Sequence, residues 1–481
     1  MSGFQSLENR SRTKIVATIG PACQSRAMLE QLVRAGVDIC RLNMAHGSRD
    51  EHQRMFEMIR NVEEDSQYPI GILVDLAGPK IRLGELSPNP LPCLVGQEYV
   101  FVRETAEAIP RQLTSNYQPL IDELAVGDRV LMADGTIEMT VLEKTSDQVR
   151  CRVIQGGELR SRQGINLPGV VLSAPAMSNV DRDNAKWAAS NGADFVSLSF
   201  VRSATDIYGL RSLLKEEGSS ALTIAKIEKP EALENLEEIV KAADGIMVAR
   251  GDLGVEIDVA TMPVAQKNII DACSTWKKPV IVATQMLDSM QRASRPTRAE
   301  VTDVANAILD GTDACMLSGE TAIGQYPIES VRMMNRIMQS IEETRLQATG
   351  CSEHTQHDKV HEVTSAVVRG AGGIAEQLGA KMVVVATRSG ATALTKSKER
   401  NLIRTVAVSD CQQTLRQMSL YWGIHPLPGA PDDLEHGLVQ FIVDWGLETE
   451  HLTPGDRVVF VTGTGVKADA HNLLMILEIP S

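Results

Sequence analysis

The sequence lacks the segments and motifs that mark several common classes of protein. No run of 18 uninterrupted apolar residues occurs, and the opening MSGFQSLENRSR has no apolar stretch, so neither a membrane-spanning helix nor a secretory leader is expected. The eight cysteines form no CxxC pair, which argues against a zinc ribbon or a disulfide framework and favours buried, idle thiols. Neither GxxxxGKS nor GxxxxGKT is present, which excludes a P-loop kinase.

The sequence also has fewer basic than acidic residues and contains few histidines. The chain has 48 Lys and Arg against 62 Asp and Glu, a formal net charge of -14, which disfavours nucleic-acid binding by the whole surface but permits a local basic pocket. Residues 1–348 contain only His46 and His52, neither beside a nucleophile, so a Ser/His/Asp hydrolase is disfavoured. We expect a soluble, cytoplasmic protein with no nucleic-acid and no membrane partner.

The chain does contain a repeated alternation of short apolar strands and longer amphipathic helical patterns. The strands are almost continuously apolar, as expected for strands buried on both faces. Eight such units favour a closed parallel barrel over an open sheet, and chemistry in such barrels lies at the carboxyl ends of the strands. The predicted strands span residues 14–18, 38–42, 71–75, 195–199, 222–226, 245–249, 279–283 and 314–318.

The alternation is interrupted twice. From about Leu83 to Pro168, β patterns punctuated by Pro and Gly replace the helices, which predicts a small β domain placed over the mouth of the site as a lid. Beyond about Thr349, a polar stretch leads into a further α/β unit with strands in KMVVVAT, IRTVAVS and RVVFVTG. The expected fold class is α/β: a (β/α)8 TIM barrel with an inserted small β-barrel lid and a C-terminal α/β domain. The expected limits are 1–82 and 169–348 for the barrel, 83–168 for the lid and 349–481 for the C-terminal domain.

Charged residues follow two neighbouring apolar runs in the middle of the chain. Lys226 and Glu228 are two apart in a strand pattern and so share a face, and Asp252 follows the next apolar run. Two carboxylates suit Mg²⁺ or Mn²⁺, which keeps its other positions for water and substrate oxygens, and a lysine suits a substrate whose negative charge grows during the reaction. An exposed ionic pair is the commoner meaning of this spacing. The apolar flanks favour a deep site instead.

One motif invites a different interpretation. GTGVKA at 463–468 follows a strand and fits the GxGxxA dinucleotide fingerprint. A dinucleotide site also needs an acidic residue about 20 positions further on, and the sequence stops at Ser481. We therefore expect no such site.

An ordered set of motifs along almost the whole chain is similar to the pyruvate kinase family: TKIVATIGPAC, CRLNMAHG, DLAGPKIR, GINLPG, AKIEK, MVARGDLGVEI, VATQML, RPTRAEVTDVANAILDGTDACMLSGETA and the YP at 326–327. GDLG alone could arise by chance, but the full set in this order is highly specific. The resemblance implies a glycolytic kinase that transfers the phosphoryl group of phosphoenolpyruvate to ADP, giving pyruvate and ATP. It also implies that the C-terminal domain is regulatory and that the protein is a homotetramer.

The resemblance assigns roles to the charged residues at the strand ends. Glu228 and Asp252 would hold the divalent cation. Arg41 and Lys226 would supply positive charge along the transfer path, with Arg82 near the phosphoryl group.

It also implies a route for the proton that the product enolate needs on carbon. Thr284 would relay this proton, through a water chain past Ser318 and Glu320, because a threonine alone is a weak acid. The remaining implied contacts are one with the substrate and two on the nucleotide side: Gly251, Asn43 and His46.

The chain departs from the family pattern near the phosphoryl group. Members that need K⁺ show Asn, Ser, Asp and Thr at four positions and an acidic residue after GP. This chain keeps Asn43 and Asp75, but Ala45 and Leu76 replace the hydroxyl residues, and Lys80 stands where the acid would be. Since an ammonium is a compact cation comparable in charge to K⁺, we expect that K⁺ is not required.

A phosphate cradle is expected in the C-terminal domain. TRSGAT at 387–392 lies between a strand and a helical pattern, so its N–H groups and hydroxyls can hold a phosphate, although an ordinary Ser/Thr helix cap is the alternative. Resemblance to the family's effector loop favours the cradle, with these binding residues: Thr387, Arg388, Ser389, Gly390 and Thr392. The opposite loop, GTGVKADAH, offers only Lys467 as a cation. We therefore expect a phosphorylated allosteric activator such as a sugar monophosphate or AMP rather than a bisphosphate.

Two other functions fit part of the pattern. One is a Mg²⁺-dependent barrel lyase that acts on a pyruvate enolate, and the β lid and the TKIVATIGPAC motif argue against it. The other is a catalytically silent sugar-phosphate sensor. The presence of all four key side chains argues against that function: Lys226, Glu228, Asp252 and Thr284.

Overall fold

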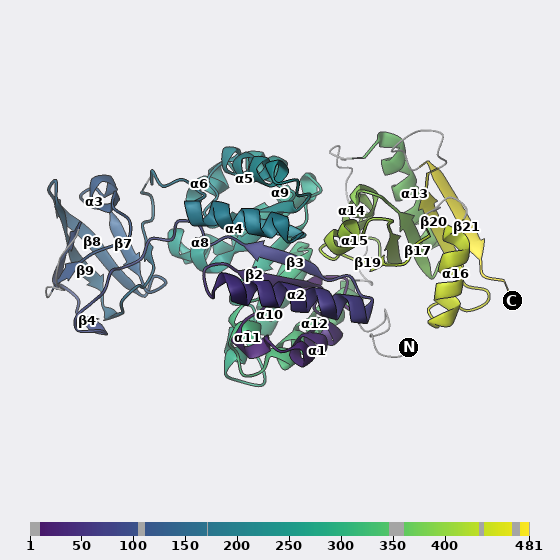
Figure 1. The fold of residues 1–481 in the computed structure, drawn as a ribbon, viewed down its shortest axis with the longest axis horizontal. Helices are drawn as coiled ribbons and strands as arrows, with labels where there is room; N and C mark the ends of the chain where they lie inside the picture. The colour runs from purple at the N-terminus through teal and green to yellow at the C-terminus, as the bar shows by residue number, and fades with distance from the viewer. Residues whose placement is uncertain are drawn as a thin grey trace.

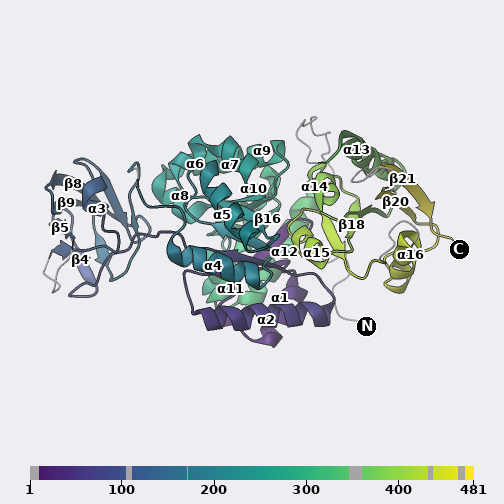
Figure 2. The same cartoon turned by 45° about the horizontal axis from the view of Figure 1, so that its top comes forward.

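The computed structural model describes residues 10–103, 111–170, 172–345, 360–431, 437–463 and 472–480, arranged in three parts along one long axis (Figure 1). A barrel lies in the middle, with a β lid at one end and an α/β domain at the other. The turned view in Figure 2 keeps this order, so the lid and the C-terminal domain flank opposite ends of the barrel.

Eight parallel strands close the barrel: β1 (Lys14–Thr18), β2 (Ile39–Asn43), β3 (Gly71–Asp75), β12 (Phe195–Leu198), β13 (Leu222–Ile227), β14 (Gly245–Ala249), β15 (Val280–Ala283) and β16 (Ala314–Leu317). Around the ring the order is β1-β16-β15-β14-β13-β12-β3-β2. Nearly every strand residue is buried, because inward side chains fill the barrel and outward ones pack under helices. The predicted TIM barrel is confirmed, and each predicted strand agrees with these bounds to within one residue at each end.

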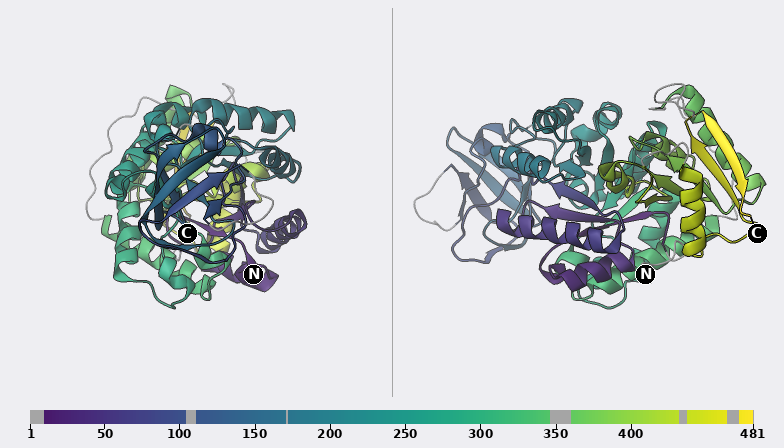
Figure 3. Two further views of the ribbon diagram at one scale, coloured as in Figure 1. Left: turned by 90° about the vertical axis from the view of Figure 1, so that its left-hand side faces the viewer. Right: turned by 45° about the vertical axis from the view of Figure 1, so that its right-hand side comes forward.

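Helices surround the barrel, as the view from the lid end shows (Figure 3). Several begin at side-chain caps, which satisfy the free N–H groups of a first turn. Ser48 and Glu51 form such a capping box, and so do Thr297 and Glu300. The main helices are α1 (Arg26–Ala35), α2 (Arg49–Ser66), α4 (Asn179–Ser190), α5 (Ala204–Glu216), α7 (Leu236–Ala242), α9 (Met262–Thr275), α10 (Arg298–Asp310) and α12 (Pro327–Arg345). Shorter helices and turns are η2 (Pro21–Cys23), α6 (Pro230–Glu234), α8 (Arg250–Glu256), η3 (Val259–Thr261), η4 (Asp288–Gln291) and α11 (Gly319–Ala322).

The lid falls between β3 and β12 in the sequence. Its elements are β4 (Leu91–Cys93), β5 (Glu98–Val102), β6 (Gln112–Leu113), α3 (Leu120–Glu123), β7 (Arg129–Met132), β8 (Ile137–Lys144), β9 (Gln148–Gln155), β10 (Gly157–Leu159) and β11 (Ile165–Asn166). Six strands form one sheet in the order β11-β7-β8-β9-β5-β6, and β4 pairs with β10. Within the described residues no pairing joins the edge strands β11 and β6. The lid is therefore a curled half barrel rather than a closed one.

The C-terminal domain is a five-stranded sheet in the order β19-β18-β17-β20-β21. Its elements are α13 (Glu362–Gln377), β17 (Met382–Ala386), α14 (Ala391–Lys398), β18 (Arg404–Val408), α15 (Gln412–Met418), β19 (Ile424–Leu427), α16 (Leu438–Glu448), β20 (Arg457–Thr462) and β21 (Leu473–Glu478). The sequence predicted the α/β class but not β19 or β21. β19 is a four-residue edge strand that contains Pro426, and β21 pairs antiparallel, outside the repeating parallel unit.

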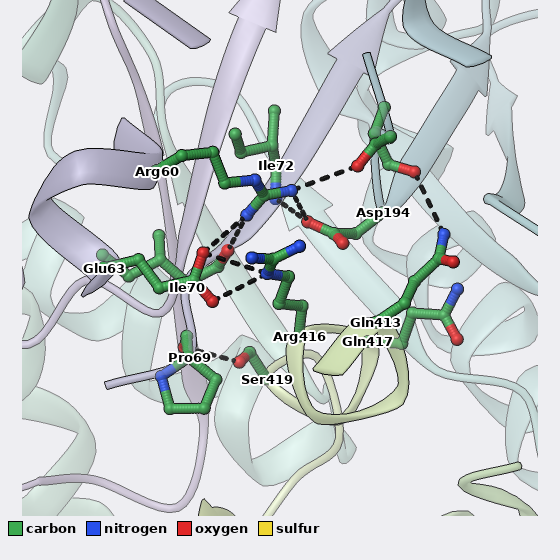
Figure 4. A network of polar contacts seen from close by, with 12 residues as sticks. Arg60, Glu63, Pro69, Ile70, Ile72, Asp194, Gln413, Arg416, Gln417 and Ser419 are labelled. Carbon is green, nitrogen blue, oxygen red and sulfur yellow. Dashed lines mark hydrogen bonds and ion pairs between the residues drawn. The ribbon is translucent and has the colours of Figure 1, made fainter. Parts of the chain in front are cut away.

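Helix α15 docks the C-terminal domain onto the amino ends of the barrel strands (Figure 4). Arg416 Nε donates to Glu63 Oε1 over 2.7 Å, and Ser419 Oγ donates to the carbonyl of Pro69 over 3.0 Å. Beside them, Arg60 Nη2 donates to Asp194 Oδ2 over 2.7 Å. The apolar core of this domain is continuous with the barrel interior at this junction. The base of the barrel is thus closed by packing, and its other end is left for a site.

Among the described residues, no helix is long and apolar enough to cross a membrane. The described cysteines are buried except for Cys411, which is exposed, whereas Cys351 lies outside the described residues.

Candidate active site at the carboxyl ends of the barrel strands

Part of the predicted site lies at the end of the barrel that carries the lid (Figure 1). A cavity of about 810 Å³ opens there, and its wall includes Asp252 and Thr284 from the barrel side and Asp134 from the β7–β8 turn of the lid. Barrel and lid together therefore line this open space, whereas Arg41, Lys226 and Glu228 are not among its described lining residues.

Lys226 lies at the centre of a buried hydrogen-bond network on β13. Its Nζ donates to Ser199 Oγ over 2.6 Å and lies 2.9 Å from Glu228 Oε1 and 3.4 Å from Asp75 Oδ1. Burial alone would lower the pKa of Lys226, but the carboxylates of Asp75 and Glu228 raise it above its ordinary value. The structure thus brings the side chains of Lys226 and Glu228 into direct contact on one face of β13, as their spacing predicts.

Arg41, at the end of β2, is held by a neighbouring strand. Its Nε donates to Asp75 Oδ2 over 2.8 Å, and its Nη1 donates to Thr18 Oγ1 over 3.0 Å. Burial acts to raise the pKa of Asp75, but Lys226 and Arg41 hold it below its ordinary value. Asp75 therefore joins the two cations and fixes their separation.

Glu228 is buried and only half satisfied. Its Oε2 accepts from the backbone N–H of Phe200 over 2.7 Å, while its Oε1 accepts no hydrogen bond from the described residues beyond its ion pair with Lys226. Phe200 has φ of 54°, which is unusual for a bulky residue. Burial raises the pKa of Glu228 against the lowering effect of Lys226. A carboxylate oxygen in this state is suited to a cation.

Asp252, in the first turn of α8, faces the same mouth. Its Oδ1 is 3.3 Å from Lys80 Nζ, and about a third of each side chain is exposed. Lys80 is the residue predicted to substitute for K⁺, and here it contacts a predicted metal ligand.

Thr284 follows β15 in a strained conformation. Its φ of 68° lies in the left-handed region, which β-branched residues rarely adopt and which costs about 1 to 3 kcal/mol. Its Oγ1 accepts from the N–H of Gly251 over 2.8 Å and donates to the carbonyl of Ala283 over 2.6 Å. Ser318 and Glu320, the predicted proton route, line the same cavity. Burial raises the pKa of Glu320, which favours its protonated form.

The other predicted barrel residues lie at the rim. Arg82 Nη1 donates to the carbonyl of Arg162 in the lid over 3.2 Å. Asn43 Oδ1 accepts from the N–H of Ala45 over 3.2 Å and so forms a local turn. His46 is exposed, and its pKa is lowered by partial burial and by the nearby Arg82.

The predicted effector residues form a separate loop in the C-terminal domain, between β17 and α14. Thr387 and Thr392 are buried, and Thr387 Oγ1 accepts from the N–H of Gly390 over 3.1 Å. Ser389 is exposed, and so is Arg388, which forms an ion pair with Asp410 over 3.0 Å. Lys467 in the opposite loop lies outside the described residues.

Sequence reasoning missed several partners of the site. Ser199, which binds Lys226, and Thr18, which binds Arg41, stand at strand ends like the predicted residues, and this position could have identified them. The backbone N–H of Phe200 carries no signal in the sequence.

The chain also matches known proteins over most of its length. Residues 10–331 match the family model of the pyruvate kinase barrel domain, and residues 365–477 match that of the pyruvate kinase alpha/beta domain. A pyruvate kinase of Staphylococcus haemolyticus is 40% identical over 471 residues, 97% of this chain and 80% of that protein. A pyruvate kinase of Staphylococcus aureus is 39% identical over 454 residues, 94% of this chain and 77% of that protein. The crystal structure of a pyruvate kinase from Cryptosporidium parvum superposes with a TM-score of 0.88 at 32% identity, covering 98% of this chain and 97% of that one. The chain therefore belongs to the pyruvate kinase family of glycolytic enzymes, which transfer the phosphoryl group of phosphoenolpyruvate to ADP.

Proposed function

We propose that Glu228 and Asp252 hold a divalent cation, Mg²⁺ or Mn²⁺, for this reaction. The observation that carries the proposal is the buried Glu228 Oε1, which accepts no hydrogen bond from the described residues beyond its ion pair with Lys226. No group of three or more His, Cys, Asp or Glu in the described ranges could hold a metal by itself. Two carboxylates leave the remaining positions to water and substrate oxygens, which suits Mg²⁺.

The surrounding side chains have complementary roles. When bound, the cation would neutralise carboxylate and phosphoryl oxygens of phosphoenolpyruvate. Lys226 and Arg41, fixed by Asp75, supply positive charge where the enolate oxygen and the moving phosphoryl group develop negative charge. Arg82 lies on the phosphoryl side, and Gly251, in the first turn of α8, contacts the substrate. Asn43 and His46 lie on the nucleotide side.

Thr284 delivers the proton that converts the enolate to pyruvate. Its hydroxyl lies beside the N–H of Gly251, in the cavity that Ser318 and Glu320 also line. A water chain from Glu320 past Ser318 can restore the proton after each turnover.

We also propose that the enzyme works without K⁺, because Lys80 brings an ammonium to the site. Its position beside Asp252 supports this assignment. The TRSGAT loop is proposed to bind a phosphorylated activator, a sugar monophosphate or AMP, through Ser389, Arg388 and the N–H groups at the start of α14.

We place the domain limits at residues 82, 168 and 348, the enzyme in the cytoplasm as a glycolytic activity, and its assembly as a homotetramer.

The decisive experiment measures Mn²⁺ binding and turnover together. Glu228→Gln and Asp252→Asn should each weaken Mn²⁺ affinity by more than about tenfold and lower kcat by about a hundredfold or more, while thermal unfolding stays close to that of the wild type. Asp194→Asn is the matched control, because it removes a buried carboxylate at the opposite end of the barrel. Normal Mn²⁺ affinity in both site variants would place the metal elsewhere.

A further inference from the structure

A second buried network lies directly beside the proposed metal site. Lys229 Nζ donates to Glu256 Oε1 over 2.6 Å, and Asn166 Nδ2 donates to the same oxygen over 3.1 Å. Each of the three residues is only 7% exposed. Removing either partner of an ion pair this deeply buried leaves an uncompensated charge and strongly lowers the stability of the fold.

The network joins the two segments that carry the metal carboxylates. Lys229 is the residue after Glu228, and Glu256 lies four residues after Asp252, one helical turn further along α8. The Lys229–Glu256 pair therefore fixes the distance between the end of β13 and α8. The distance between the Lys229 and Glu256 side chains therefore limits how far apart Glu228 and Asp252 can lie.

Helix α8 depends on such anchors. It has only seven residues, RGDLGVE, and two of them are glycines, so its intrinsic helix stability is low. The anchor at its start is the hydrogen bond from Gly251 to Thr284. The pair with Lys229 is the corresponding anchor at its end.

The third member of the network belongs to the lid. Asn166 is in β11, the last strand of the lid before the chain returns to the barrel. The lid also approaches α8 closely at the β7–β8 turn, where a Cβ added to Gly135 would lie 3.5 Å from Val255 Cγ1. Lid movement therefore acts on α8 at two adjacent residues, Val255 and Glu256.

Glu256 is not arranged for maximum stability. Its Oε2 is buried and accepts no hydrogen bond from the described residues, while its Oε1 accepts two. A buried oxygen without a donor costs free energy, so the arrangement calls for a reason other than stability.

We propose that Lys229, Glu256 and Asn166 are positioning residues that couple the placement of the lid to the spacing of Glu228 and Asp252. With the lid seated, Asn166 holds Glu256 on Lys229 and keeps α8 at the distance that a divalent cation requires. When the lid swings away, Glu256 loses one of its two donors and α8 is less well fixed. The inference rests on the proposed metal site.

The test measures Mn²⁺ affinity of the full-length enzyme without substrates, by electron paramagnetic resonance. Glu256→Gln and Lys229→Met should weaken it about tenfold, the size usually seen when a residue that orients a metal ligand is lost. Asn166→Ala should weaken it by about threefold, since Lys229 still holds Glu256, and should speed hydrogen exchange in α8. Lys229→Arg keeps the charge and should restore most of the affinity.

Two controls separate the possible outcomes. Lys398→Met breaks a similarly buried pair, Lys398 with Asp313 at 2.6 Å, at the other end of the barrel, and should lower thermal stability without changing Mn²⁺ affinity. If Glu228→Gln binds Mn²⁺ normally, the metal site itself is misplaced. If Glu228→Gln loses Mn²⁺ but the Glu256, Lys229 and Asn166 variants bind it like the wild type, the coupling is overturned while the proposed metal site stands.

Discussion

Lys80 Nζ lies 3.3 Å from Asp252 Oδ1, so a lysine that precedes the lid contacts a carboxylate at the start of α8. The contact puts a protein cation next to a proposed metal ligand and close to the proposed phosphoryl path. Because both side chains are about a third exposed, the pair contributes little to stability, and its significance lies in the charge it brings to the site.

The first prediction concerns K⁺. In buffers free of Na⁺ and K⁺, at matched ionic strength, the enzyme should keep nearly its full rate, because Lys80 supplies the charge. Lys80→Glu should cripple turnover, since it removes the ammonium and puts a second carboxylate beside Asp252.

Added K⁺ should rescue Lys80→Glu only partly, because Ala45 provides no hydroxyl ligand. Lys80→Met removes the ammonium without adding a carboxylate, so comparing it with Lys80→Glu separates the effect of losing the cation from the effect of gaining an anion. A large stimulation of the wild type by K⁺ would contradict the prediction.

The second prediction concerns Lys226. Lys226→Met should lower kcat by about 10² to 10³ with little change in the KM for phosphoenolpyruvate, because its charge matters most in the transition state. Steady-state kinetics provide the measurement. Lys278→Met, which removes a buried lysine at the amino ends of the strands, is the control. A raised KM with unchanged kcat would make Lys226 a binding residue.

The third prediction separates the hydroxyl of Thr284 from its backbone strain. Thr284→Val keeps the branched shape and the strain but removes the hydroxyl, and should slow solvent proton exchange into the pyruvate methyl group by about a hundredfold. Thr284→Ser keeps the hydroxyl and should retain most of the exchange. Equal exchange rates in Thr284→Val and the wild type would exclude a proton relay by Thr284.

The fourth prediction concerns the effector loop. Ser389→Asp puts a negative charge into the proposed cradle and should abolish activation by AMP or a sugar monophosphate, while the rate without activator stays unchanged. Ser146→Asp adds the same charge to an exposed position of the lid and should leave activation intact. Equal activation of both variants would refute the placement, and tight activation by fructose 1,6-bisphosphate alone would refute the preference for a monophosphate.

The fifth prediction uses a buried lysine of the C-terminal domain. Burial lowers the pKa of Lys396 from 10.5 to about 8, and its Nζ donates to Asn401 over 3.0 Å. Between about pH 8 and 10.5 the unfolded chain binds more protons than the folded one, so this group makes stability rise with pH. Below about pH 8, Lys396 is charged in the folded protein, and the free energy needed to bury that charge lowers the stability of the fold in full.

Lys396→Met should therefore be more stable than the wild type at pH 7, by roughly 2 kcal/mol after the loss of one hydrogen bond. Thermal unfolding at several pH values measures the difference, which should shrink between pH 8 and 10.5. Lys381→Met, an exposed lysine of the same domain, should show no such trend. A stability gain that does not change with pH would indicate better packing and not the removal of a buried charge.

The sequence by itself determined the barrel, the order of the motifs and the residues at the strand ends. These features are local, because an apolar strand buried on both faces and a residue at its end can be recognised without knowing what packs against them. The pairing of Lys226 with Glu228 followed from the two-residue period of a strand. The contacts of Arg41 with Asp75 and of Lys80 with Asp252 did not follow, because they join separate strand ends.

Tertiary structure alone decided the features that depend on long-range packing. In the described part of the lid the edge strands β11 and β6 do not pair, so the lid is a half barrel, and strand patterns in the sequence do not encode this curvature. Arg416 binds Glu63 from 353 positions away, and Asn166 binds Glu256 from 90 positions away. The positive φ of Thr284 is likewise maintained by its surroundings against its own preference. Such contacts form only when the whole chain is folded, so no local pattern in the sequence announces them.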